Sequence, residues 1–160
     1  MSIIIDIIIL AVLISVIILL VWYSHYLQTR KKKKKIEHFL KFVNKNNYNI
    51  NECEVLHDNL IGIDTSAKML FFQNLKKKFE FVVDLSIYNR CHLNETSRSI
   101  NGQNSKSRIT DKLELAFSPV NPKQPVLYLE FYNVENGDFQ VSGEFDLLEK
   151  WIQIINKQFK

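Results

Sequence analysis

The chain has 160 residues, of which 24% are charged, and its net charge is +4 at pH 7. All 21 Lys and Arg residues lie at or beyond residue 30, and six of them occupy positions 30–35. Residues 36–160 hold 15 Lys and Arg against 16 Asp and Glu, so the basic character belongs to one short block. We therefore expect no nucleic-acid partner, because nucleic-acid binding calls for a basic face on the folded domain. Four Gly and three Pro residues are also too few for a disordered tail.

The first predicted element is a membrane anchor over residues 1–29, with the span at about residues 7–27. This apolar run has the length that crosses a bilayer core about 30 Å thick, which takes roughly 20 residues of helix. Inside lipid the backbone must pair its own polar groups, so a single span is helical. A cleaved signal peptide is the competing interpretation, but it would carry positive charge before a shorter apolar run. Trp22, Tyr23 and Tyr26 end the run, as interfacial aromatic residues do.

A block of six cations follows the span and predicts its orientation. The block consists of Arg30, Lys31, Lys32, Lys33, Lys34 and Lys35. Positive charge stays on the cytoplasmic side, so we expect the N-terminus outside and the C-terminal part in the cytoplasm. The chain would then be a single-pass protein of the inner or plasma membrane. The bilayer is the first expected partner, through the span and through attraction of the block to anionic lipid.

Residues 30–51 form the predicted juxtamembrane segment. Within it, residues 36–46 place Ile36, Phe39 and Val43 at helical spacing. They either continue the anchor helix or lie as a short amphipathic helix on the membrane. The Asn-rich stretch at 44–51 ends this helix.

Residues 52–160 are predicted to form one mainly β domain, beginning with period-two strands. These expected strands lie at residues 52–57, 60–63, 68–73 and 79–85, with a weaker one at 87–93. Asp64 opens the turn between the second and third strands, since Asp side chains bond to nearby backbone. The lysine run 76–78 is expected as a solvated turn before the fourth strand.

The second half of the domain ends in a helix. Residues 94–111 are rich in Asn, Ser and Arg and are expected to form a long mobile loop. Residues 112–117 and 126–132 alternate between apolar and polar and predict a second hairpin. Residues 145–159 place Leu148, Ile152 and Ile155 on one stripe of an amphipathic helix.

This order of about seven short antiparallel strands and one C-terminal helix resembles the pleckstrin-homology-like (PH-like) domain of bacterial proteins. The resemblance covers about residues 50–159 and is carried by the hairpin LIGIDTSAKMLFF at 60–72 and the helix FDLLEKWIQIINKQF at 145–159. It implies a partly open antiparallel barrel closed by the helix, often attached to membrane spans. The first hairpin offers Lys68 in place of a basic cluster, so inositol-lipid binding is not implied.

No motif for catalysis is present in the sequence. Cys53, His57, Cys91 and His92 lack the tight paired spacing of a zinc site, so no metal and no cofactor are expected. Both cysteines should remain thiols in a reducing cytoplasm. We therefore expect a protein that is not an enzyme.

The expected function is a membrane-tethered, cytoplasm-facing interaction module that binds a protein or membrane surface. Its candidate contact residues are Asp64, Lys68, Lys76, Lys77 and Lys78, and the expected loop 94–111 is a further candidate contact. The alternative is a structural subunit of a cell-envelope or secretion-type assembly, with the apolar helix packed among other spans. The near absence of small residues in the span gives little support to such packing.

Overall fold

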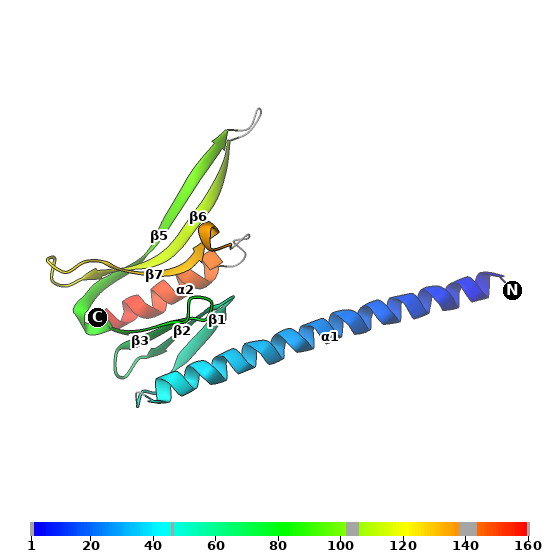
Figure 1. The fold of residues 1–160 in the computed structure, drawn as a ribbon, viewed down its shortest axis with the longest axis horizontal. Helices are drawn as coiled ribbons and strands as arrows, with labels where there is room; N and C mark the ends of the chain where they lie inside the picture. The colour runs from blue at the N-terminus through cyan, green and yellow to red at the C-terminus, as the bar shows by residue number, and fades with distance from the viewer. Residues whose placement is uncertain (1, 46, 102–105, 138–143, 160) are drawn as a thin grey trace.

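The computed structural model describes residues 2–45, 47–101, 106–137 and 144–159. They form one long N-terminal helix, two antiparallel sheets and a C-terminal helix that lies between the sheets (Figure 1). The protein is therefore mainly β with helices, as the sequence predicts. The two sheets do not join into a closed barrel.

The first sheet has four strands in the order β1-β2-β3-β4, and the second has three in the order β5-β6-β7. Short 3-10 helices follow β4, β7 and α2. The elements in chain order are α1 (Ser2–Lys45), β1 (Glu52–Leu56), β2 (Asn59–Asp64), β3 (Met69–Asn74), β4 (Phe79–Asp84), η1 (Leu85–Ile87), β5 (Tyr88–Asn101), β6 (Lys106–Pro119), β7 (Leu127–Asn133), η2 (Val134–Asn136), α2 (Glu144–Asn156) and η3 (Lys157–Phe159).

The strands of the first sheet lie where period-two alternation predicts them. Ile61 pairs with Phe72, and Phe72 with Phe81, so one face of the sheet carries a row of large apolar side chains. The hairpins around Asp64 and around the lysine run 76–78 are confirmed. The second hairpin is confirmed as the antiparallel pair β6 and β7.

The prediction of a mobile loop at 94–111 is wrong. Strands β5 and β6 continue through this segment up to Asn101 and from Lys106, and residues 102–105 lie outside the described residues. Cross-strand ion pairs support the ribbon: Arg98 Nε lies 3.2 Å from Asp111 Oδ1, and Arg108 lies 3.3 Å from Glu95. The polar composition reflects a ribbon solvated on both faces, where alternation with apolar residues is not required.

The main core lies between the two sheets and is filled by α2. Leu148, Trp151 and Ile155 of α2 have no exposed surface and pack with apolar residues of both sheets. Each such side chain stabilises the fold by about 1.5–3 kcal/mol when fully buried. The stripe predicted for residues 145–159 is thus the contact between α2 and the core.

A second, smaller core joins α1 to the outer face of the first sheet. Phe39 and Val43 of α1 are fully buried against Leu60 and Phe71. Gly62 permits this close approach, because a Cβ at that position would lie 2.7 Å from Phe39 Cε1. Of the two alternatives for residues 36–46, the structure shows the continuation of the anchor helix, and its apolar face covers the sheet.

One unbroken helix therefore joins the apolar segment to the folded domain. Within its described residues, α1 is long and apolar enough to cross a bilayer by length and composition. At 1.5 Å per residue, the end of the apolar run at Leu27 lies about 18 Å along the helix from Phe39. The domain is held at a short and fixed distance from the apolar segment.

Candidate functional site

The last cation of the block contacts the domain directly. Lys35 Nζ donates hydrogen bonds to the carbonyl oxygen of His57, at 2.6 Å, and to Asp58 Oδ1, at 2.9 Å. Both residues lie in the turn between β1 and β2, so this end of the first sheet is the one nearest the apolar half of α1. We call it the anchor-proximal end. The opposite end, with the turn between β2 and β3, is the anchor-distal end.

The same turn reaches α2 through a histidine. His57 has a left-handed backbone (φ 52°), and its Nδ1 lies 3.1 Å from Glu144 Oε1 in the first turn of α2. The His57 side chain is 65% exposed, whereas that of Glu144 is 2% exposed. Glu144 Oε2 is buried, and none of the described residues forms a hydrogen bond with it. A series of polar contacts thus links Lys35 of α1, the β1–β2 turn and Glu144 of α2.

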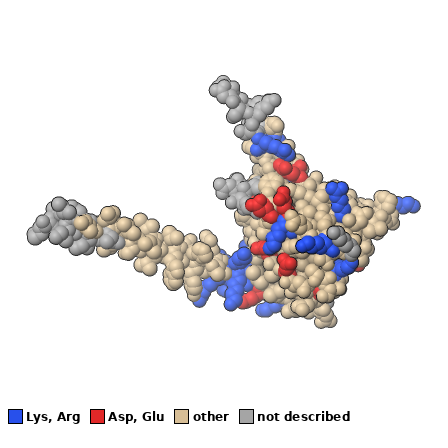
Figure 2. All heavy atoms as spheres, turned by 180° about the vertical axis from the view of Figure 1, so that it is seen from behind, with Lys and Arg blue, Asp and Glu red and all other residues tan. Residues whose placement is uncertain are grey.

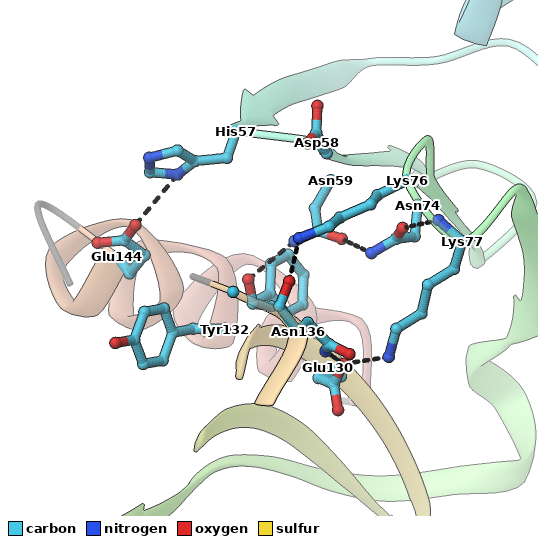
Figure 3. Close-up of a pocket in the computed structure, with 12 residues that line it drawn as sticks. His57, Asp58, Asn59, Asn74, Lys76, Lys77, Glu130, Tyr132, Asn136 and Glu144 are labelled. Atoms are coloured by element: carbon cyan, nitrogen blue, oxygen red, sulfur yellow. Dashed lines mark hydrogen bonds and ion pairs between the residues drawn. The ribbon is translucent and has the colours of Figure 1, made fainter. Parts of the chain in front are cut away.

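A cavity of about 280 Å³ opens at the anchor-proximal end (Figure 3). The β1–β2 turn, the β3–β4 turn, β7, η2 and the start of α2 all contribute to its wall. The side chains in it are mainly polar and come from segments far apart in the sequence. They include His57, Asn59, Asn74, Lys76, Lys77, Glu130, Asn136 and Glu144.

Glu130 on β7 is the centre of the charge network in this cavity. Lys77 Nζ lies 2.5 Å from Glu130 Oε1, and the side-chain amides of Asn133 and Asn136 donate to the same carboxylate at 2.9 and 2.8 Å. Burial would raise the pKa of Glu130, but the hydrogen bonds from Lys77 and Asn133 and the charge of Lys77 lower it on balance. Glu130 is therefore an ionised structural acceptor.

The lysine run is divided by these contacts. Lys76 Nζ donates to the carbonyl oxygen of Asn136, and Lys77 is paired with Glu130, so both fasten the β3–β4 turn to β7 and η2. Lys78 is exposed, with a left-handed backbone (φ 51°). The prediction of a turn is right, but two of its three lysines contact other elements, Lys76 with η2 and Lys77 with β7.

Asp64 and Lys68 lie at the anchor-distal end, away from the cavity. Asp64 Oδ1 accepts from the backbone N–H groups of Ser66 and Ala67, and Oδ2 accepts from Asn49 N–H at 2.9 Å. Lys68 is exposed in the same turn. Because β3 separates the two turns, the structure does not bring Asp64 and Lys68 together with Lys76 and Lys77.

The contacts of Asp64 predict a pH-dependent stability. Hydrogen bonds from the N–H groups of Ala67 and Asn49 hold the pKa of its carboxyl below the ordinary value, although burial opposes them. A lowered folded pKa adds stability above the unfolded value of about 3.9, and this stability is lost as the pH falls through the folded pKa. We expect Asp64→Ala to cost about 1 kcal/mol near pH 7 and less at pH 3, measured by denaturant unfolding. A deficit that is the same at both pH values would contradict this origin. Glu149→Ala, at an exposed carboxylate, is the matched control.

The interfacial residues line one side of α1. The Trp22 and Tyr26 rings stack with centroids 6.1 Å apart, and the Arg30 guanidinium lies 4.6 Å from the centre of the Tyr26 ring. Tyr23 is 58% exposed. These residues and Arg30 form a continuous aromatic and cationic surface at the C-terminal end of the apolar run, and Figure 2 shows basic side chains gathered where α1 meets the body.

Sequence reasoning missed the residues that complete the cavity. Glu130 and Glu144 are separated from Lys77 and His57 by most of the domain, and no local spacing links them.

The described residues contain no cluster of three or more His, Cys, Asp or Glu side chains able to hold a metal ion. Cys53 packs in the outer core and Cys91 in the main core.

The architecture defines a mainly β protein with two antiparallel sheets, a helix between them and a long apolar N-terminal helix. No protein-family model matches the chain, and neither a curated protein nor a solved structure matches it.

Proposed function

We propose that this protein is a single-pass membrane protein that holds a PH-like interaction module at the cytoplasmic face of the inner or plasma membrane. The observation that carries the proposal is the unbroken α1 helix, whose first part is apolar and exposed and whose last turns are buried in the domain. Trp22 is 68% exposed and Leu20 63%, as expected for side chains that face lipid. A flexible linker would not fix the distance of the domain from the bilayer, whereas this helix does.

The PH-like assignment is part of this proposal. Seven antiparallel strands followed by a C-terminal helix agree with the layout that the resemblance implies. Trp151, in the helix that would close the barrel, is fully buried in the core formed by residues of both sheets.

The module is proposed to bind, not to catalyse, and its contact surface is the anchor-proximal cavity. Lys77 and Glu130 form an ion pair there, and Lys76 donates a hydrogen bond to a backbone carbonyl. These contacts fix the shape of the cavity wall. Because the cavity lies at the end nearest the membrane, its partner is a surface of another membrane-associated protein. Confinement to the membrane raises the effective concentration of the two partners.

Topology is the decisive test of this proposal. We expect Ala67→Cys, in the exposed β2–β3 turn, to react with a membrane-impermeant maleimide only after cells are permeabilised. Ser2→Cys, at the other end of the span, should react in intact cells. The native thiols give a low background because burial raises the pKa of Cys53 and raises that of Cys91 to about 12, and the thiolate is the reactive form.

The reverse labelling pattern would overturn the cytoplasmic proposal and favour the envelope or secretion-type structural subunit. Release of the chain from membranes by alkaline carbonate would overturn the anchor itself.

A further inference from the structure

Strands β5 and β6 extend beyond the rest of the second sheet as a two-stranded arm. The last position at which all three strands lie side by side is where Lys112 of β6 pairs with Thr96 of β5 and with Asn133 of β7. Beyond it, residues 97–101 pair only with residues 106–110. We call these two segments the arm. Figure 1 shows the arm rising from the body and leaning toward the side where the N-terminal half of α1 lies.

The strand directions place the arm at the anchor-proximal end. β5 begins at the anchor-distal end, where Leu85 N–H donates to the carbonyl oxygen of Lys68 at 2.9 Å. β5 runs in the same direction as β7, since both are antiparallel to β6. β7 ends beside the anchor-proximal cavity, as the contact between Glu130 and Lys77 shows. The arm therefore continues past that end of the domain.

The length of the arm matches the distance to the membrane surface. From Leu27, where the apolar run ends, to Lys35, which contacts the domain, α1 rises about 12 Å. The five residues by which β5 extends past the three-stranded level span about 16 Å. The arm is thus long enough to reach the level at which the apolar run of α1 ends.

The charge of the arm fits an anionic lipid surface. Its residues include Arg98, Lys106 and Arg108 and no Asp or Glu. The acidic partners Asp111 and Glu95 lie at its base, and Figure 2 shows basic side chains on the arm with acidic ones nearer the body. The side chains of Arg98 and Arg108 are 60% and 68% exposed, so each guanidinium group, although paired with one carboxylate, also has N–H groups that can reach phosphate oxygens.

We propose that the arm is a second membrane contact, which binds the headgroups of anionic lipids beside the span. The proposal rests on the membrane anchorage proposed above. Two contacts, one at α1 and one at the arm, would fix the domain's rotation about the axis of α1 as well as its distance from the bilayer. The anchor-proximal cavity would then face along the membrane surface.

Hydrogen exchange of the full chain in vesicles tests the arm. We expect the amides of residues 97–101 and 106–110 to exchange at least about fivefold more slowly in phosphatidylcholine vesicles containing phosphatidylserine than in phosphatidylcholine alone. The double change Arg98→Gln and Arg108→Gln should abolish the difference. Lys123→Gln removes an exposed cation from the β6–β7 connection at the anchor-distal end, and should leave the difference unchanged.

Equal exchange rates in the two lipids, or a difference that survives the double change, would overturn the arm contact. Exchange in pure phosphatidylcholine reports whether the double variant still forms the ribbon, which separates loss of lipid contact from loss of structure. Failure of the chain to float with either vesicle would instead contradict the anchor, so the two proposals fail in different ways.

Discussion

Replacing Trp151 by alanine is expected to destabilise the domain by about 3–5 kcal/mol, the range for truncating a large buried aromatic side chain. Trp151 has no exposed surface and lies in the main core, where residues of both sheets meet α2. Small domains are stable by only about 5–15 kcal/mol, so the loss is a large fraction of the total. Urea unfolding followed by pulse proteolysis, in detergent that holds α1, measures the change.

Gln153→Ala is the matched control, because Gln153 is exposed on the same helix. We expect it to change the free energy of unfolding by less than about 0.5 kcal/mol. Trp151→Phe keeps an aromatic ring in the core and should fall between the two. If Trp151→Ala cost no more than Gln153→Ala, α2 would not be the element that holds the sheets together.

The position of α2 shows what periodicity can and cannot predict. The spacing of Leu148, Ile152 and Ile155 predicts a helix with one apolar stripe. It does not specify what the stripe covers. The structure places α2 between two sheets, where the fully buried Trp151 lies beside Leu148 and Ile155 in one core.

The ribbon of β5 and β6 was missed for a related reason. Alternation identifies a strand only where apolar residues recur at every second position, as Leu113, Leu115 and Phe117 do in β6. In the arm both faces meet solvent, so Ser, Arg and Asn residues occupy a strand without any apolar pattern. Pairing with the neighbouring strand, which no local composition encodes, holds the segment extended.

The sequence predicts a helix at residues 36–46, but it does not predict that the apolar face of this helix packs against the first sheet. Phe39 and Val43 form an apolar face that suits either a membrane surface or a protein core. The choice depends on Gly62, which lies under Phe39 and leaves room for its ring. The fit of Phe39 over Gly62 is a tertiary contact, which the local sequence pattern around either residue does not encode.

The candidate site was predictable only in part, for the same physical reason. Lys76 and Lys77 are visible as a basic turn, but the groups that bind them belong to β7 and η2. Glu144 is simply an acidic residue near a helix start until His57 is placed beside it. Contacts between segments far apart in the sequence therefore decide which charged side chains have a structural role.

Replacing Lys31–Lys34 by glutamine is expected to weaken the preference of the protein for one orientation. Of the eight cations within about 18 residues after Leu27, four would remain, namely Arg30, Lys35, Lys41 and Lys45, and the bias of positive charge near the span sets topology. Ala67→Cys should then become reactive toward impermeant maleimide in a measurable fraction of molecules in intact cells. Lys35 is kept because it holds the β1–β2 turn, so docking of α1 is left intact.

The matched control is Lys76→Gln, Lys77→Gln and Lys78→Gln, which removes three cations far beyond the span. Only charges within about 15–20 residues of a span influence its orientation, so this variant should label like the parent. Its expected defect is local, a loosened contact between the β3–β4 turn and β7, because Lys77 no longer pairs with Glu130. If both variants kept the domain protected in intact cells, the block would serve lipid binding and not topology, and the orientation would have to be set by the domain itself.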